Sequence, residues 1–320
     1  MNLALWLAAI AFAVVNGVND GGALVSVGLD VRRLTPLTSL VVLAVAVAAA
    51  PVLIGTAVAT TLTDRLVTLD GADGAIAMVV AVSVATVVTW ALAARGLPTS
   101  LTLAVVGAIA GAGVGAQLPV SWATVGVVLL LGILAPLAGL ALAWVLMRIA
   151  AALPSQGSID RRTQRWHIGA FGLQCLAYGA NDGQKMLAVV AVAAGTAGRG
   201  EVPAAPWHLA LIAIAFLIGA TIGLRRVAGT LGGGVVAVQP HEAVVSELAA
   251  ATVVLGTGAI GSPVSMTQAV AGGLVGVGGT RGWTRVRWTQ VVRLGGAWIV
   301  TLPAAFVAAM LVTNLTLRVT

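Results

Sequence analysis

Apolar stretches of about 20 residues follow one another along nearly the whole chain, with short polar segments between them. Only 8% of the 320 residues are charged and 59% are hydrophobic, whereas soluble domains carry about 25% charged residues. A soluble fold cannot hide so much apolar side chain, because its surface must stay largely polar. A helix of about 20 apolar residues spans the hydrocarbon core of a bilayer. The sequence therefore predicts an all-α integral membrane protein.

Ten segments have the length and composition of membrane crossings. They are 3–29, 36–62, 75–94, 98–117, 122–147, 167–198, 204–224, 242–261, 263–279 and 290–313. The polar interval 154–166 is predicted to be a cytoplasmic linker between an N-terminal unit, 1–153, and a C-terminal unit, 167–320. The stretch 227–239 is too short to span a bilayer and too rich in glycine for a firm helix.

Charge, cysteine and histidine content exclude several classes of function. The net charge is +7, but the basic residues lie singly or in small groups between apolar stretches, so no nucleic-acid surface is indicated. Cys175 is the single cysteine of the chain, which excludes an internal disulfide and a cysteine metal cluster. His167, His208 and His241 do not have the spacing of metal ligands. We therefore predict neither a bound metal nor a cofactor.

The two units are predicted to be repeats of each other. The pair Asn19-Asp20 returns as Asn181-Asp182, and the segment 97–113 returns at 262–278, where both copies read P-x-S-x-T-x4-G-x3-G-x-G. The two pairs of landmarks come in the same order and at nearly the same spacing, and self-similarity at a fixed spacing indicates a structural repeat. Five crossings separate the copies if 98–117 and 263–279 span the bilayer and are not re-entrant. On that count we predict two inverted-topology repeats of about five segments each, as in many secondary transporters.

Positively charged loops indicate the orientation. With the N-terminus outside, most arginines between the crossings fall in cytoplasmic loops, as the positive-inside rule requires. These are Arg32, Arg33, Arg95, Arg148, Arg161, Arg162, Arg165, Arg225, Arg226, Arg281, Arg285 and Arg287, against Arg65, Arg199 and Arg318 outside. Arginine far outnumbers lysine, which is typical of GC-rich bacterial genomes. We predict a protein of the bacterial inner membrane with both termini outside.

The Asn-Asp pairs place charge where apolar residues are expected. An aspartate in hydrocarbon costs roughly 2.5–3.5 kcal/mol on insertion scales, so Asp20 and Asp182 are predicted to face an interior site, where Na⁺ or a proton neutralises them. The neighbouring glycines favour broken helices at mid-membrane, which are tolerated only around a protein-lined or water-filled site. The freed N–H groups would attract an anion and the freed carbonyls a cation. Glu247 is either a further proton carrier or an interhelical hydrogen-bond partner.

Amide and hydroxyl side chains supply groups that could surround an oxyanion. Asn19 and Asn181 can both donate and accept, and Lys185 lies on the helical face of Asp182, where it could pair with that aspartate or with an anionic substrate. The paired P-x-S-x-T segments add hydroxyl groups, although hydroxyls in membrane helices often bond only to the backbone or to another helix. The glycine rows at 107–115 and 272–279 are expected to permit close helix packing.

Several of these motifs resemble those of the inorganic phosphate transporter (PiT) family. They are GANDGQK at 179–185, GVND at 17–20, LPTS at 97–100, SPVSMTQAVAGGLVGVG at 262–278 and AWIVTLPAA at 297–305. The resemblance implies phosphate symport driven by Na⁺ or protons, with a central site built from both Asn-Asp motifs and both P-x-S segments. The Gln-Lys continuation is similar to bacterial members associated with proton coupling and metal-phosphate uptake. A homodimer is one oligomeric state that the sequence leaves open.

Three positions depart from the family pattern, with Ala23 where asparagine is usual and Leu103 and Gln268 where histidine is usual. The coupling ion and the anion stay open, so a sulfate or other oxyanion permease is an alternative. An intramembrane aspartyl protease is another, because two aspartates could share a proton, and a non-transporting phosphate sensor is a third. We expect a transporter rather than an enzyme. The predicted coupling-ion ligands are Asp20, Asp182 and Glu247, and the predicted substrate ligands are Asn19, Asn181, Gln184, Lys185, Ser100, Thr102, Ser265 and Thr267.

Overall fold

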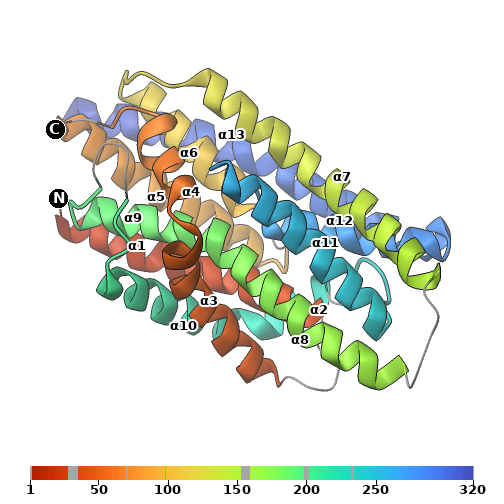
Figure 1. The fold of residues 1–320 in the computed structure, drawn as a ribbon. Coiled ribbons are helices and arrows are strands. Elements are labelled where there is room, and N and C mark those ends of the chain that lie inside the picture. The colour runs from red at the N-terminus through yellow and green to blue at the C-terminus, as the bar shows by residue number, and fades with distance from the viewer. Residues whose placement is uncertain are drawn as a thin grey trace.

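A computed structural model describes residues 2–27, 35–69, 71–97, 99–152, 159–197, 202–231 and 234–319. Most of these residues lie in helices that run roughly along one direction and form a bundle (Figure 1). The β pairing found in these ranges is a single bridge between Val67 and Val120. The predicted all-α class is confirmed.

The helices follow the two halves of the sequence. Those of the first half are α1 (Asn2–Asn16), α2 (Gly22–Val27), α3 (Pro36–Ile54), α4 (Ala57–Thr60), α5 (Gly71–Ala93), α6 (Leu101–Gly115) and α7 (Trp122–Ala152). Those of the second half are α8 (Ile159–Tyr178), α9 (Gln184–Ala193), α10 (Pro206–Leu231), α11 (Pro240–Ala259), α12 (Met266–Thr280) and α13 (Trp288–Val319). Three π turns, η1 (Gly17–Gly21), η2 (Thr61–Arg65) and η3 (Gly179–Gly183), and a 3₁₀ turn, η4 (Trp283–Arg285), complete the described elements.

Most of the predicted crossings correspond to helices that are long and apolar enough to span a bilayer. In the described chain these are Leu3–Val27, α3, α5, α7, Pro206–Leu224, α11 and α13. Helices α6 and α12 have 15 residues each, which is about 22 Å at 1.5 Å per residue and short of a hydrocarbon core of about 30 Å. The predicted crossings 98–117 and 263–279 are therefore helices that reach only part of the way.

Two polar intervals are more helical than the sequence indicates. Helix α8 begins at Ile159, inside the predicted linker 154–166, because its first turns hold no proline or glycine and include arginine and glutamine, which are good helix formers. Helix α10 continues to Leu231, inside the stretch 227–239. One glycine in a helix costs only about 1 kcal/mol, so Gly229 does not end it.

The predicted crossing 36–62 is interrupted. Helix α3 ends at Ile54, where Gly55 adopts a φ of 103°, a conformation that glycine reaches at little cost. The chain then continues as α4 and η2. Pro98, Arg32, Arg33 and Arg199 lie outside the described residues, as does the start of the linker.

The two halves exchange their short helices. Helix α6 packs along α13 of the second half, and α12 packs along α7 of the first half (Figure 1). Glycines permit this approach, since a Cβ added to Gly107 would lie 2.6 Å from the carbonyl oxygen of Leu302, and one added to Gly272 would lie 2.8 Å from Cα of Pro136. Gly107 and Gly272 occupy the same position of the shared P-x-S-x-T pattern, so the two contacts are repeat-related. The predicted role of the glycine rows in close packing is confirmed.

The outer surface of the bundle is apolar. Large side chains such as Leu53, Ile133 and Ile299 are exposed, whereas many polar groups, described below, are buried. This distribution suits a lipid environment, in which exposed apolar side chains carry no penalty. The chain is a multi-pass membrane protein, and its two termini lie at the same end of the bundle (Figure 1).

Candidate functional site

The two Asn-Asp pairs lie in π turns. The turns η1 and η3 occupy matching positions of the sequence repeat, one in each half. A π turn inserts an extra residue into a helix and is frequent at functional sites. The predicted helix breaks therefore take the form of widened turns, not of unwound segments, and the flanking Asn16 and Gly22 keep right-handed helical dihedral angles. Both turns are fully buried, where an unwound backbone would lack hydrogen-bond partners.

The two π turns that hold the Asn-Asp pairs, η1 and η3, are each covered by a helix of the opposite half. Helix α10 packs against η1, and α3 packs against η3. A Cβ on Gly17 would lie 2.7 Å from the backbone nitrogen of Ala220, and one on Gly179 would lie 2.8 Å from the carbonyl carbon of Ala46. The motif glycines thus let the halves meet at the two Asn-Asp pairs.

Asn19 and Asn181 hold the extended segments that precede the two short helices. Oδ1 of Asn19 accepts from the backbone N–H of Thr99 at 3.0 Å, and its Nδ2 donates to the carbonyl of Thr99 at 2.9 Å. Oδ1 of Asn181 accepts from the backbone N–H of Val264 at 3.3 Å. Thr99 and Val264 each directly precede the serine of a P-x-S segment, so the asparagines play repeat-related roles. Nδ2 of Asn181 has no partner among the described residues.

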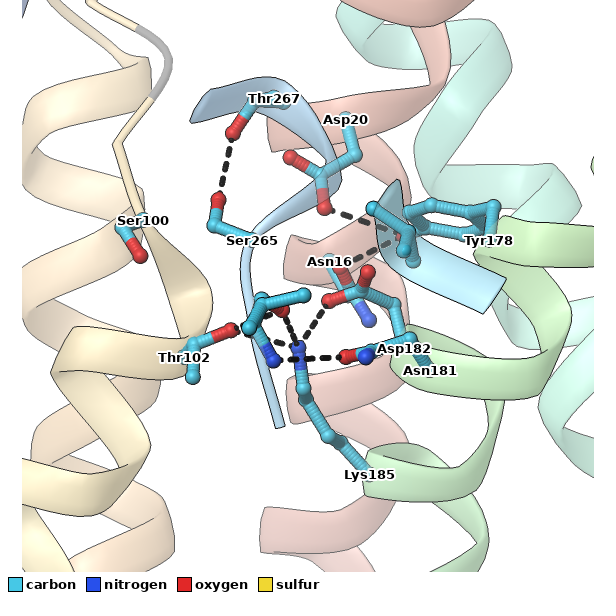
Figure 2. A network of polar contacts seen from close by, with 12 residues as sticks. Asn16, Asp20, Ser100, Thr102, Tyr178, Asn181, Asp182, Lys185, Ser265 and Thr267 are labelled. Carbon is cyan, nitrogen blue, oxygen red and sulfur yellow. Dashed lines mark hydrogen bonds and ion pairs between the residues drawn. The ribbon is translucent and has the colours of Figure 1, made fainter. Parts of the chain in front are cut away.

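Lys185 is the centre of the polar contacts around the second Asn-Asp pair (Figure 2). Its ammonium donates to Oδ1 of Asp182 at 2.6 Å, to the hydroxyl of Thr102 at 2.6 Å and to the carbonyl of Val264 at 2.7 Å. The Lys185 side chain is 0% exposed. The predicted pairing with Asp182 is present, and Thr102 brings a first-half residue into the same cluster.

Asp20 is bonded by neutral groups. Nδ2 of Asn19 donates to its Oδ1 at 2.6 Å. The hydroxyl of Tyr178 lies 3.1 Å from Oδ2 of Asp20 and 2.9 Å from Oδ1 of Asn16, so its single proton can be donated to either. Tyr178 immediately precedes η3 and so connects the first-half aspartate to the second-half motif (Figure 2).

The remaining predicted hydroxyls lie at the starts of α6 and α12. Ser100 caps α6 by accepting from the backbone N–H of Leu103 at 3.3 Å. Ser265 and Thr267 are hydrogen-bonded to each other at 2.9 Å. All three are buried, and Figure 2 shows them with Asp20, Thr102 and Lys185 in one polar region. The structure thus brings most of the predicted residues together, and Tyr178 and Asn16 lie with them. The predicted residues in this region are Asn19, Asp20, Ser100, Thr102, Asn181, Asp182, Lys185, Ser265 and Thr267.

The hydrogen bonds found for the Gln184 side chain join it to α4 and not to this cluster. Its Oε1 accepts from the backbone N–H groups of Val58 at 2.8 Å and Ala59 at 3.2 Å, at the start of α4. Residues two apart on a helix do not share a face, so the Gln184 side chain does not lie on the face that Asp182 and Lys185 share. Gln184 is bound to the interruption after α3.

Replacing Gln184 with leucine is expected to lower the apparent melting temperature of the purified protein by roughly 5 °C, because two buried N–H groups would lose their acceptor at about 1–3 kcal/mol each. Gln184→Glu keeps an acceptor oxygen and serves as the control. Thermal unfolding in detergent measures the effect. A leucine variant as stable as wild type would contradict this role.

Glu247 belongs to a separate buried pair. Its Oε1 lies 3.2 Å from Nε2 of His167, which joins α11 to α8. Neither side chain is more than 2% exposed, and no hydrogen bond found in the described residues links them to the Lys185 cluster. The sequence left two roles open for Glu247, a proton carrier and an interhelical hydrogen-bond partner. Its contact with His167 fits the second role.

Two residues of the cluster were missed by sequence reasoning. Asn16 and Tyr178 each stand directly before a motif glycine and so occupy matching positions of the two halves. Both are polar residues in apolar surroundings, and that matched position is the signal that could have found them. The described residues hold no group of three or more His, Cys, Asp or Glu side chains suited to a metal ion.

A comparison with known protein families decides the class of the chain. The sequence model of the phosphate transporter family matches residues 16–168 and, a second time, residues 152–309. The chain belongs to the phosphate transporter family. The two matches agree with the repeat found in the sequence, and membership in a transporter family removes the protease alternative.

Members of the phosphate transporter family resemble this chain over nearly its whole length. A probable low-affinity inorganic phosphate transporter of Mycobacterium leprae is 30% identical over 95% of this chain and 77% of its own length. The protein of that description in Bacillus subtilis is 26% identical over 95% and 93%. A solved structure described as the sodium-dependent phosphate transporter has a TM-score of 0.86 over 99% of both chains, at 17% identity. The last comparison confirms the fold.

Proposed function

We propose that this chain imports inorganic phosphate across the bacterial inner membrane by symport with a cation, Na⁺ or H⁺. Family membership supports transport, and the relatives described as inorganic phosphate transporters support the substrate. The observation that carries the proposal is a buried charged cluster at the junction of two inverted halves. Secondary transporters bind substrate and coupling ion at such a junction.

The predicted roles divide by chemistry. Asp20 and Asp182 would serve the coupling cation, because buried carboxylates need a positive partner. The amides and hydroxyls would surround the phosphate, which offers many acceptor oxygens. Nδ2 of Asn181 is a buried donor without a protein partner in the described chain, as expected of a group that donates to a bound anion.

The exchanged helices suggest how access would alternate. Helices α6 and α12 both start at the polar cluster, and each packs along a long helix of the other half. A rocking movement of one half against the other would therefore change how the P-x-S segments lie relative to the Asn-Asp pairs, which suits alternating access. The predicted orientation, with both termini outside, belongs to this proposal.

Uptake by proteoliposomes tests the proposal. Labelled phosphate is expected to accumulate above its equilibrium level when a Na⁺ gradient or a proton gradient is imposed, because symport spends the gradient of the companion ion. Empty liposomes and liposomes without a gradient are the controls. Excess unlabelled sulfate and added Mg²⁺ test the oxyanion permease and the metal-phosphate substrate.

The other outcomes separate the alternatives. Competition by sulfate as strong as by phosphate would favour a general oxyanion permease. Phosphate binding to the purified protein without gradient-driven accumulation would favour a sensor and contradict symport.

A further inference from the structure

The ammonium of Lys185 lies in a shell of oxygen atoms. Its three N–H donors contact a carboxylate oxygen of Asp182, the hydroxyl oxygen of Thr102 and the carbonyl oxygen of Val264, all within 2.6–2.7 Å. A lysine ammonium has three donors and no acceptor, so these contacts use its full capacity. Carboxylate, hydroxyl and carbonyl oxygens are also the ligands of hard cations, and membrane transporters hold Na⁺ with such groups beside helix interruptions.

The sequence repeat supplies a matching position in the first half. In the two Asn-Asp motifs, Asp20 corresponds to Asp182 and Ala23 corresponds to Lys185. In the two P-x-S-x-T segments, Thr267 corresponds to Thr102 and Thr99 corresponds to Val264. The repeat-related set around Asp20 therefore has an aspartate and a backbone carbonyl from the first half and a threonine from the second half, but the methyl group of Ala23 stands in place of the lysine side chain.

The charges around the two aspartates differ accordingly. Asp182 has a cationic partner at 2.6 Å. Asp20, which is 3% exposed, receives hydrogen bonds from Asn19 and Tyr178, both neutral, and no ion pair of the described chain includes it. A buried carboxylate with only neutral donors is costly unless a cation joins it. Asp20 thus lacks a direct cationic partner, which a proton or a metal cation from solution can supply, whereas Asp182 already has one.

We infer that Lys185 is a tethered cation that permanently occupies the second-half coupling-ion position, so that the position at Asp20 is the one that takes a mobile monovalent cation. This inference rests on the proposed function and refines it, because it assigns different roles to the two aspartates. The chain would move one mobile cation fewer per phosphate than a relative with oxygen shells open in both halves.

Removal of the lysine tests the inference by opening the shell. Lys185→Ala, which copies Ala23, removes the charge and the volume, and Na⁺ with water can enter. Lys185→Met removes the charge but keeps most of the volume, so the shell stays closed. We expect Na⁺, compared with choline at equal ionic strength, to raise the apparent melting temperature of the alanine variant by roughly 3 °C more than that of wild type, at Na⁺ well above its dissociation constant. The methionine variant should show no added shift.

Two further measurements complete the test. Adding Asp182→Asn to the alanine variant should abolish the extra Na⁺ response. A folded alanine variant without that response, or one matched by the methionine variant, would overturn the inference. If the alanine variant does not fold, the count of ²²Na⁺ bound per wild-type chain decides, since at most one is expected and two would exclude a filled second position. Binding to the purified protein needs no phosphate movement, so failure of phosphate uptake would overturn the proposed function and leave this result standing.

Discussion

Asp182→Asn is expected to reduce gradient-driven phosphate uptake roughly a hundredfold or more. The change removes the carboxylate that lies 2.6 Å from the ammonium of Lys185 and leaves a buried charge without its partner. Breaking a buried ion pair in this way destabilises the surrounding structure by about 3–5 kcal/mol. Where that cost falls on the transport-competent state, each 1.4 kcal/mol lowers the rate about tenfold. Initial rates in proteoliposomes, normalised to reconstituted protein, measure the loss.

The matched control is Asp73→Asn. Asp73 is an exposed residue in the first turn of α5, so its removal should leave uptake near the wild-type rate. A double variant, Asp182→Asn with Lys185→Met, separates folding from transport, because it is neutral at both positions and should elute as a folded protein while still failing to accumulate phosphate. Wild-type uptake by Asp182→Asn would show that this carboxylate has no part in transport.

Gly111→Leu is expected to lower the apparent melting temperature by roughly 2–12 °C and to reduce uptake in parallel. A Cβ at Gly111 would lie 2.8 Å from Cα of Phe306 on α13, so a leucine must push α6 and α13 apart. Overpacking of a close contact costs typically about 1–3 kcal/mol, and about 2–4 °C of melting temperature corresponds to each kcal/mol in a large domain. Thermal unfolding in detergent and uptake by proteoliposomes provide the two readouts.

Gly126→Leu controls for the change of residue type. Gly126 lies on an exposed face of α7, with no other atom within 4 Å of an added Cβ. This variant should unfold at or above the wild-type temperature, since leucine is the better helix former. Equal stability of the Gly111 and Gly126 variants would mean that the contact between α6 and α13 does not limit stability.

Much of the fold could be predicted because hydropathy and repetition are local properties. The apolar lengths predicted the helices, and the shared P-x-S-x-T pattern predicted the repeat that the family matches also show. The lengths of α6 and α12 could not be predicted, because the apolar segments around them extend further than the helices do. Their ends are set by the extended segments at Thr99 and Val264, which Asn19 and Asn181 hold from another part of the chain.

The candidate site was predicted unevenly. Asp20, Asp182 and Lys185 could be chosen by residue type, because a charge in an apolar helix must face a polar interior. Glu247 met the same criterion, and Gln184 was chosen as a neutral polar residue of the motif, yet their side chains contact His167 and α4. Proximity to a motif in sequence does not give side-chain direction, and residues two apart on a helix point to different sides.

Hydropathy and matched spacing are enough to predict the membrane class, the inverted repeat and the aspartates that must be buried, because these depend on the free energy of transfer of each segment and on the order of the motifs. The oxygens that surround Lys185 could not be predicted in this way, since Thr102 lies 83 residues before it and Val264 lies 79 residues after it. Contacts between residues so distant in sequence are fixed by helix packing, here by the glycines that let α6 and α12 cross into the opposite half. The difference that we infer between a filled cation position at Asp182 and an open one at Asp20 comes from the sequence, because Lys185 in one repeat stands where Ala23 stands in the other, whereas the packing supplies the oxygens around the ammonium.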